Sequence, residues 1–167
     1  VSHLRSWQRV EDAITLELDP GFFVTLSFAQ DNQLQIGYSA TAPAQSPAAK
    51  PGAIDIQIDE SAEQLLITAS GLRVRVQRDP YQLVVEGSDG QVLFAGVENG
   101  VRWLRCGDEV LRISQSWHTP AGERFFGFGE RFNAFDQRGQ QIDSVVYEQY
   151  KNQDKRTYLP VPFFISS

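Results

Sequence analysis

The amino-acid sequence predicts an all-β protein that folds as an antiparallel β-sandwich. Along most of the chain, apolar and polar residues alternate, and a period of two residues is typical of half-buried strands. Glycine, proline and aspartate clusters separate these runs about every 8–12 residues, as in sandwiches and barrels. No window has a helical period longer than two turns, so helices are not expected.

The first series of predicted strands covers residues 13–18, 22–28, 33–39 and 53–58. In AITLEL at 13–18, for example, apolar and polar side chains take turns, which gives the strand one apolar face. Residues 44–53, AQSPAAKPGA, contain two prolines and several small side chains, which predict a loop.

The second series predicts hairpins. RDPY at 78–81 and GSDGQ at 87–91 lie between alternating runs, and Asp-Pro and Asp-Gly supply the backbone angles of tight turns. The runs of this series are QLLITAS, GLRVRVQRDP, YQLVVEGSDG, QVLFAG, VRWLRC and EVLRISQSWH. The two series together give about ten strands, and we expect residues 1–167 to form a single domain.

The character of the sequence changes near residue 121. RFFGFGERFNAFDQRG at 124–139 mixes phenylalanines, glycines and charged residues at irregular spacing, and the following residues to 157 have no clean period. Long irregular loops in compact domains are usually functional or disordered, and disordered segments are poor in aromatic residues. We therefore expect an ordered, functional loop.

The composition excludes several functions. The net charge is −6, whereas a nucleic-acid-binding protein needs a basic face. There is no lysine and arginine run for an anionic membrane, and the apolar runs are too short to cross a bilayer. The one cysteine, Cys106, cannot form an internal disulfide, and His3 and His118 lie far apart in the sequence. We expect no nucleic-acid or membrane partner, no metal and no cofactor.

The ends of the sequence suggest a location and an extent. VSHLRSWQRV at 1–10 lacks the apolar centre of a signal peptide, which together with the single cysteine favours a cytoplasmic location. YLPVPFFISS at 158–167 is apolar and strand-like, whereas domains usually end in polar residues. We therefore expect more protein to follow residue 167.

Several kinds of active site can be weighed from the residues alone. There is no G-x-S-x-G elbow, and GFGERF at 127–132 lacks the second half of a phosphate-binding G-x-G-x-x-G. A retaining glycosidase needs two carboxyl groups about 5–5.5 Å apart. The sequence alone does not show which of the candidate carboxylates lie that close together. Each candidate taken singly is better explained as a solvated group or as the partner of an arginine. These carboxylates are Glu123, Glu130, Asp136, Asp143, Glu148 and Asp154.

Three tyrosines of the irregular region indicate a carbohydrate ligand. Tyr147, Tyr150 and Tyr158 lie among Asn, Gln, Asp and Arg residues. Sugars stack their C–H faces on aromatic rings, and their hydroxyls need planar hydrogen-bonding groups. The loop thus has the side chains that a sugar-binding surface uses.

At these residues the sequence resembles a known family. FFGFGERFNAFDQRGQ, followed by NQD and YLPVPFFIS, is similar to the N-terminal β-sandwich of family 31 glycoside hydrolases, the α-glucosidase and α-xylosidase group. Upstream, GLRVRVQRDPYQLVVEGSDGQVLF resembles the same domain through its RDPY hairpin and the DGQVL after it. The resemblance covers about residues 65–167.

This resemblance implies a galactose-mutarotase-like supersandwich. In the family, that domain precedes a (β/α)8 barrel that carries both catalytic aspartates, so the resemblance implies that this chain holds no catalytic residue. The whole protein would be a retaining α-glycosidase acting on α-linked glucosides or xylosides. Its implied partners are a carbohydrate substrate and the catalytic barrel of the same polypeptide.

The resemblance also implies sugar contacts in the irregular loop. Residues 152–154, NQD, match an Asn-x-Asp loop whose aspartate hydrogen-bonds substrate hydroxyls, so Asp154 is the implied contact. Its neighbours Arg156 and Thr157 are implied as further contacts. Many members have a Trp-Asn pair before this aspartate, whereas this chain has VYEQYKNQD, which leaves the sugar open.

The stretch at 124–139 would then be a core strand that leads into the root of this loop. Phe126 and Phe128 would anchor the sandwich, and Gly127 and Gly129 would permit a bulge or a close backbone approach. The residues expected to hold the loop by ion pairs and hydrogen bonds are Glu130, Arg131, Asp136 and Arg138.

Two other functions stay open from the sequence. A free-standing carbohydrate-binding module would need a sugar affinity of its own. An aldose mutarotase needs a general acid and base, normally a histidine with a carboxylate, and only His3 and His118 are available for that role.

Overall fold

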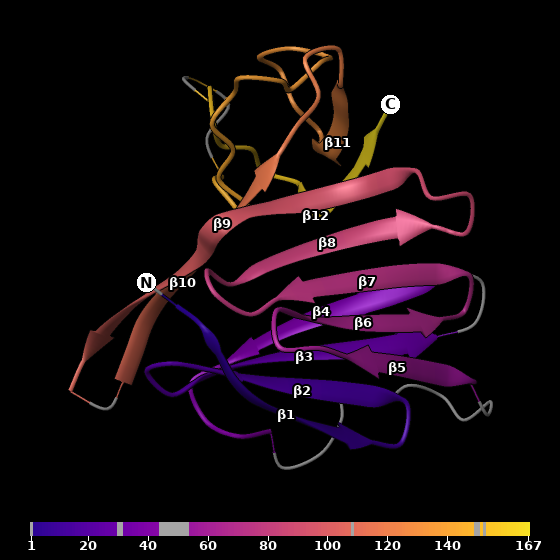
Figure 1. Ribbon diagram of the computed structural model, residues 1–167. Coiled ribbons are helices and arrows are strands. Elements are labelled where there is room, and N and C mark those ends of the chain that lie inside the picture. Colours follow the sequence, from indigo (N-terminus) through magenta and orange to yellow (C-terminus); the bar gives the residue numbers. More distant parts are fainter. Residues whose placement is uncertain (1, 30–31, 44–53, 108, 149–150, 152) are drawn as a thin grey trace. The chain divides into compact units, whose positions relative to one another are not determined.

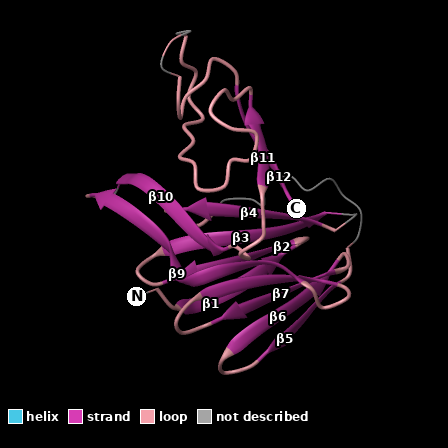
Figure 2. Cartoon of the chain, turned by 90° about the horizontal axis from the view of Figure 1, so that it is seen from above, coloured by secondary structure: helices cyan, strands magenta, loops and turns pink. Residues whose placement is uncertain are grey.

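The structure is a computed structural model, and it describes residues 2–29, 32–43, 54–107, 109–148, 151 and 153–167. The chain divides into two compact units, Val1–His118 and Thr119–Ser167. The described residues form strands, turns and loops without a helix (Figure 2), so no helix among them could span a membrane. That residues 1–167 form a single domain stays a prediction.

The first unit contains a four-stranded antiparallel sheet in sequence order (Figure 1). Its strands are β1 (Leu4–Val10), β2 (Ala13–Leu18), β3 (Phe22–Ala29) and β4 (Gln33–Ser39). Each strand pairs with the next along the chain, so the sheet is a simple meander. Such connections need only short turns.

A six-stranded antiparallel sheet completes the first unit, in the order β10-β9-β8-β7-β6-β5. Its strands are β5 (Ile56–Glu60), β6 (Gln64–Ala69), β7 (Leu72–Gln77), β8 (Gln82–Gly87), β9 (Val92–Cys106) and β10 (Glu109–His118). Between β6 and β7, Ser70 and Gly71 both have positive φ, of 50° and 74°. Two successive positive φ values are those of the tight hairpin turn that matches the strand twist.

One hydrophobic core joins the two sheets. On β3, alternate residues are buried completely, from Phe22 through Val24 and Leu26 to Phe28. The six-stranded sheet contributes alternate residues of β6 and β7 to the same cluster, among them Leu65, Ile67, Val74 and Val76. The period of two in the sequence is therefore the period of burial.

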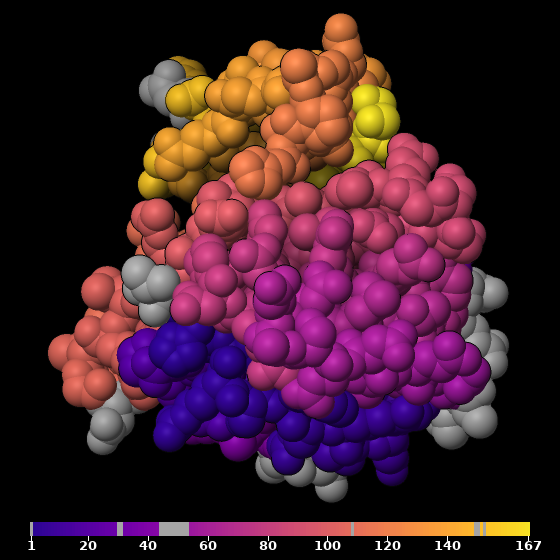
Figure 3. Space-filling model, viewed as in Figure 1, coloured from indigo at the N-terminus to yellow at the C-terminus, as the bar shows by residue number. Residues whose placement is uncertain are grey.

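The opposite face of the larger sheet carries ion pairs on β7 and β8. Figure 3 shows side chains of residues 56–87, in magenta, forming a continuous outer surface of the first unit. On this surface Arg75 Nη2 lies 2.7 Å from Glu86 Oε1, and Arg73 is 4.0 Å from the same carboxylate. Glu86 and Arg73 are cross-strand partners, so ion pairs lie where the pleat turns side chains towards water.

The second unit is built on a two-stranded antiparallel sheet of β11 (Phe125–Gly129) and β12 (Pro160–Ser166). The described residues between them, 130–148, 151 and 153–159, form a long loop with an isolated parallel bridge from Val146 to Thr157. This segment is called the unit-2 loop.

The structure confirms the all-β antiparallel class and most predicted strands. The hairpins at RDPY and GSDGQ are confirmed, because β7 pairs with β8 and β8 with β9. Strand β1 was not predicted, and the runs QVLFAG and VRWLRC belong to the single strand β9. The loop predicted at residues 44–53 lies outside the described residues.

Phe126 and Phe128 lie on β11 of the second unit, where both are half-buried. That they anchor the sandwich stays a prediction. Their strand is part of a two-stranded sheet, and the aromatic partners described for them, Phe135 and Phe164, are residues of the second unit. The phenylalanines of this stretch thus form aromatic contacts within the second unit.

The core predicts a clear contrast between two leucines on strands of the same sheet. Leu65 has no exposed surface, whereas Leu93 is 50% exposed. We expect Leu65→Ala to lower the free energy of unfolding by about 2–5 kcal/mol because it leaves a cavity, and Leu93→Ala by less than about 1 kcal/mol. Urea titration of both variants measures this, and equal losses would contradict the assigned core.

Candidate functional site

The unit-2 loop starts and ends where β11 and β12 approach each other closely. Gly127 and Gly129 have φ values of 117° and 89°, and the ladder shifts register between them. A Cβ on Gly129 would lie 2.1 Å from the Leu159 carbonyl oxygen, and one on Gly127 would lie 2.8 Å from that of Phe163. The predicted close approach is confirmed, since only glycine fits both the angles and the space.

Aromatic pairs cover this small sheet. Phe128 stacks on Phe164 with ring centroids 4.9 Å apart, and Phe125 meets the same ring edge-on at 5.8 Å. Phe126 contacts Phe135 at 5.1 Å, although Phe135 is 86% exposed. Aromatic contacts of this kind add to the burial of apolar surface, and here they stabilise a sheet of only two strands.

Arg131 ties together three parts of the unit-2 loop. Its Nε donates to the Phe128 carbonyl at 2.9 Å, Nη1 to that of Lys155 at 2.9 Å, and Nη2 to that of Asp143 at 3.2 Å. Burial lowers the pKa of Arg131 below its usual value, while the nearby Asp143 carboxylate acts in the opposite direction. Arginine stays protonated in proteins, so Arg131 is a permanent donor to three backbone carbonyls, and its predicted support role has a clear geometry.

Asp136 fixes the turn after β11. Its Oδ1 accepts the backbone N–H of Arg138 at 3.0 Å and that of Phe125 at 3.3 Å, and Oδ2 lies 3.4 Å from Arg124 Nη1. The pKa of this carboxyl lies below its ordinary value, chiefly because the Arg138 N–H bonds to the charged form, whereas desolvation opposes the shift. The turn is thus held by the ionised carboxylate.

Arg138 extends the same support to residues before β11. Its Nη1 donates to the Pro120 carbonyl at 2.9 Å and to the Glu123 carbonyl at 2.5 Å. Between Asp136 and Arg138, Gln137 is 4% exposed, and its backbone N–H donates to the Phe125 carbonyl at 2.8 Å. The start of the unit-2 loop is therefore held on both sides of β11.

Glu130 and Thr157 connect the two ends of the loop. The Thr157 hydroxyl donates to the Glu130 carbonyl at 2.5 Å, and Tyr158 donates its hydroxyl to the Glu130 side chain. Thr157 has no exposed surface. Its hydroxyl therefore closes the loop in this structure, while Glu130 acts as the acceptor at the other end.

Arg156 lies in an ordered setting between a carboxylate and an aromatic ring. Its Nε is 3.3 Å from Asp143 Oδ2, and its guanidinium carbon is 5.3 Å from the centre of the Tyr147 ring. Lys155 Nζ lies 3.6 Å from the same carboxylate oxygen. The side chain of Arg156 nevertheless keeps 48% of its surface exposed, so it can both be oriented and meet a ligand.

Asp154 is exposed and lies at a turn with positive φ, 38°. The turn is closed by the Arg156 N–H, which donates to the Gln153 carbonyl at 2.6 Å. A left-handed backbone is tolerated better by aspartate and asparagine than by most residues. Asn152, the first residue of the predicted Asn-x-Asp loop, lies outside the described residues, as does Tyr150.

A hollow of about 430 Å³ lies beside the loop root. The residues that line it are Gly127, Gly129, Arg131, Phe132, Asn133, Ala134, Phe135 and Gln137. Of the predicted site residues, only Arg131 borders this hollow. Arg131 and Arg156 both contact Asp143. Arg131 donates to its backbone carbonyl, and Arg156 pairs with its side-chain carboxylate.

Residues 15–167 match the sequence profile described as the glycosyl hydrolase 31 N-terminal galactose mutarotase-like domain. The chain belongs to this family. The galactose-mutarotase-like fold expected from the resemblance is therefore confirmed. The family description places this domain at the N-terminal side of glycosyl hydrolase 31 enzymes.

Two relatives show which enzymes carry similar domains. An isomaltosyltransferase of Sporosarcina globispora is 33% identical over 150 residues, which are 86% of this chain and 13% of that enzyme. A 1,3-alpha-isomaltosidase of Kribbella flavida is 50% identical over 66 residues, or 38% of this chain and 9% of the relative. The chain therefore spans a small part of the relatives that it matches.

Solved structures agree with this assignment. A cycloalternan-forming enzyme from Listeria monocytogenes, in complex with a pentasaccharide substrate, matches with a TM-score of 0.83 and 31% identity. The match covers 99% of this chain and 16% of that enzyme. A family 31 dextranase from Flavobacterium johnsoniae, 20% identical over 99% of this chain and 21% of its own, shares the fold with a TM-score of 0.76.

The contacts of three residues that organise the loop were not predicted from the sequence. Asp143 was weighed only as one carboxylate among six, although it lies beside Lys155 and Arg156. Tyr147 and Gln137 gave no sign of their contacts, because Tyr147 meets Arg156 nine positions further along and Gln137 is buried by the turn around it. No local period marks such contacts.

The close approach of β11 and β12 predicts a large effect of one methyl group. We expect Gly129→Ala to destabilise the second unit by about 2 kcal/mol or more, because alanine meets both a left-handed φ and backbone atoms of Leu159 and Val161. Gly122→Ala is the control, since its Cβ would meet nothing within 4 Å. Hydrogen exchange of the β12 amides measures the difference, and unchanged protection in Gly129→Ala would refute the assigned packing.

The lowered pKa of Asp136 predicts a pH-dependent contribution to stability. Its folded-state pKa lies below that of an unfolded aspartate, about 3.9, so the stabilisation is present above that pH and is lost as the pH falls through the folded-state value. We expect Asp136→Asn to be less stable than the parent chain at pH 7 and the gap to narrow in acid. Urea midpoints from pH 7 to pH 2 measure it, and a gap that is constant over this range would contradict the linkage.

Proposed function

We propose that this chain is the non-catalytic N-terminal domain of a retaining enzyme that acts on α-glucosides, and that its unit-2 loop forms part of the sugar pocket. The observation that carries the proposal is the match of residues 15–167 to the family together with 33% identity to an isomaltosyltransferase over 86% of the chain. The catalytic (β/α)8 barrel would belong to the remainder of the same polypeptide. A cytoplasmic location stays a prediction.

Within the unit-2 loop, Asp154 and Arg156 are the proposed sugar contacts. Both are exposed, and a carboxylate and a guanidinium can each form two hydrogen bonds with neighbouring hydroxyls. The carboxylate of Asp143 and the ring of Tyr147 hold Arg156 in one orientation, which reduces the entropy lost on binding. Thr157, proposed with them from the resemblance, is buried and would act by closing the loop behind the two exposed residues.

Apolar surface of the second unit supports a role beside another domain. Phe135, Val145 and Val146 are 86%, 67% and 60% exposed. On β12, Phe163 and Ile165 are 63% and 60% exposed. Exposed apolar side chains such as these can take part in an interaction surface, and the proposed neighbour is the catalytic domain.

Transfer of a glucosyl unit to another sugar is a second candidate for the whole enzyme. Two relatives from Sporosarcina globispora carry transferase names, an isomaltosyltransferase and a 1,6-alpha-glucosyltransferase that is 26% identical over 140 residues. A retaining mechanism allows either water or a sugar hydroxyl to take the glycosyl group from the enzyme. Chromatography of the products from an α-1,6-linked oligosaccharide separates hydrolysis from transfer.

The 167-residue chain is expected not to hydrolyse an aryl α-glucoside, whereas the full polypeptide is expected to do so. The reason is that the proposed catalytic carboxylates lie outside this chain. Release of the aryl alcohol measures both proteins side by side. Turnover by the short chain would refute its non-catalytic role, and tight sugar binding by its unit-2 loop alone would favour a free-standing binding module. Polarimetry on fresh α-glucose tests the remaining alternative, a mutarotase.

Substitution of Arg156 tests the sugar contact in the full enzyme. We expect Arg156→Gln to raise KM about tenfold, the effect of one lost charge-assisted hydrogen bond, with a smaller change in kcat. Lys155→Gln is the matched control, because it removes the other cation at Asp143. An equal rise of KM in both variants would show that substrate binding depends only on the positive charge beside Asp143. An unchanged KM in Arg156→Gln would show that Arg156 does not contact the sugar.

A further inference from the structure

The hollow beside the root of the unit-2 loop, called the loop-root hollow, has two exposed phenylalanines in its lining. Its volume is about 430 Å³. Phe132 and Phe135, which line it, are 62% and 86% exposed. Among the large apolar side chains that the structure describes, Phe135 is the most exposed. Two such rings favour an apolar group that would cover them.

Contacts within the second unit already restrain these two rings. The Phe135 ring lies 5.1 Å from that of Phe126, and the Phe132 ring stacks on that of Tyr158 with centroids 6.5 Å apart. A group that enters the loop-root hollow therefore meets side chains that have lost part of their freedom beforehand. Less side-chain entropy is then lost on contact.

The polar side chains of the lining are engaged in hydrogen bonds of their own. Each of the three nitrogens of Arg131 donates to a backbone carbonyl, at 2.9–3.2 Å. The amides of Asn133 and Gln137 bond to each other at 3.2 and 3.3 Å, and Gln137 also donates to the Ala134 carbonyl. Sugar hydroxyls need free donors and acceptors, whereas an apolar side chain needs only the rings.

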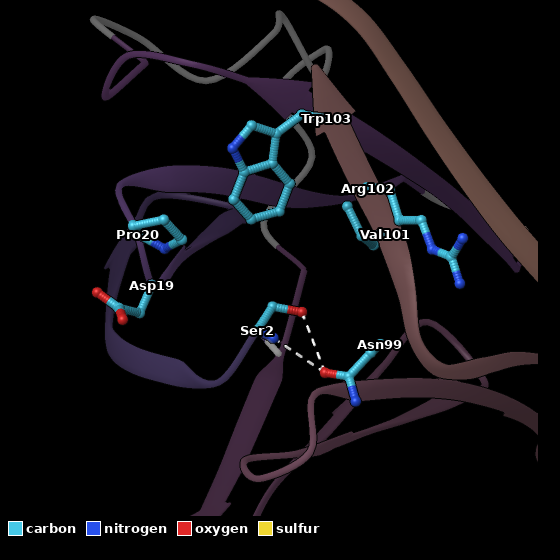
Figure 4. A pocket seen from close by; sticks show the side chains of 7 residues that line it. All are labelled: Ser2, Asp19, Pro20, Asn99, Val101, Arg102 and Trp103. Carbon is cyan, nitrogen blue, oxygen red and sulfur yellow. Dashed lines mark hydrogen bonds between the residues drawn. The ribbon is translucent and has the colours of Figure 1, made fainter. Parts of the chain in front are cut away.

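The concave site of the first unit differs in this respect. It has a volume of about 500 Å³. One face of the Trp103 indole in its lining is covered by the buried Phe22, with ring centroids 4.3 Å apart. The Asp19 carboxylate and the Arg102 guanidinium point away from the indole (Figure 4). The loop-root hollow, with two exposed rings, is therefore the better docking site of the two.

We propose that the loop-root hollow receives an apolar side chain from the catalytic part of the same polypeptide, which packs against Phe132 and Phe135. The family description names an N-terminal domain, and this chain spans only a small part of the relatives that it matches. A neighbour with apolar surface is therefore expected beside this domain. The inference rests on the proposed function and names the contact by which the catalytic part holds the unit-2 loop.

Arg131 connects this contact with the proposed sugar contact. It borders the loop-root hollow and donates to the Asp143 carbonyl at 3.2 Å. The Asp143 carboxylate in turn lies 3.3 Å from Arg156 Nε. A partner seated in the hollow restrains Arg131, and through Asp143 it helps to position Arg156 before the sugar binds.

The reactivity of a thiol introduced by Phe135→Cys tests the contact. Alkylation by iodoacetamide, followed at this position by mass spectrometry, is compared between the 167-residue chain and the full polypeptide. We expect the reaction to be at least about tenfold slower in the full polypeptide, because a covered thiol reacts only when the contact opens. Equal rates in a full polypeptide that turns over its substrate would overturn the proposal.

Two further arms on the 167-residue chain test other occupants of the loop-root hollow. The thiol at position 135 is alkylated at rising chain concentration and, separately, with added isomaltotriose. We expect neither to change the rate. Protection that grows with chain concentration would assign the hollow to a second copy, and protection by isomaltotriose would assign it to a sugar. Either result would overturn the assigned occupant.

Filling the loop-root hollow tests its part in the contact. Ala134→Phe adds a ring to the lining, and Ala121→Phe is the matched control, because Ala121 is exposed and does not line the hollow. In the full polypeptide we expect Ala134→Phe to restore most of the thiol reactivity at position 135. With the natural Phe135, it should raise KM for an α-1,6-linked oligosaccharide about fivefold, the effect of one side chain that is no longer held. Ala121→Phe should change neither.

The outcomes of these tests can be told apart. A thiol that stays protected in Ala134→Phe would place the contact outside the loop-root hollow, and an unchanged KM with the thiol exposed would remove the link to Arg156. Either result would overturn the proposal. Failure of the parent full polypeptide to turn over an aryl α-glucoside would instead count against the proposed function.

Discussion

Each strand of the first unit has one apolar face, and that face leaves water only if a second sheet covers it. The alternate side chains of β3 and of β6 and β7 meet in one cluster for this reason, while the outer face of the larger sheet carries ion pairs such as Arg75 with Glu86. The concave site of the first unit depends on the same packing. Trp103 can line a cavity because Phe22, a core residue, supports its other side.

The second unit is stabilised in a different way. Its sheet has two strands, which bury little surface by themselves, and the described residues of the long loop between them form no further strand. Side chains therefore satisfy backbone groups: Arg131 donates to three carbonyls, Asp136 accepts two N–H groups and Arg138 donates to two carbonyls. Buried or half-buried backbone groups need such partners, and this explains the number of charged residues in an otherwise aromatic segment.

The different ways in which the two units are stabilised fit a domain that supports a site on another part of an enzyme. In the second unit, hydrogen bonds fix the root of the loop, and exposed polar and apolar side chains follow among its described residues. Arg156 illustrates the principle, since Asp143 and Tyr147 orient it while half of its surface stays available. Binding groups placed in this manner lose little freedom when a ligand arrives.

The sequence by itself determined the fold class, most strands and two of the hairpins, because a period of two residues and the turn dipeptides are local signals. It also indicated that Gly127 and Gly129 lie at a close approach and that Arg131 and Asp136 hold a loop. Only the tertiary structure decided that Phe126 and Phe128 contact Phe135 and Phe164, that Thr157 is buried, and that Asp143 and Tyr147 meet Arg156. It alone brought Asp19, Asn99 and Trp103 together around one cavity. These contacts join residues that are distant in the chain, and no local pattern records which distant backbone segments will come within hydrogen-bonding or van der Waals range.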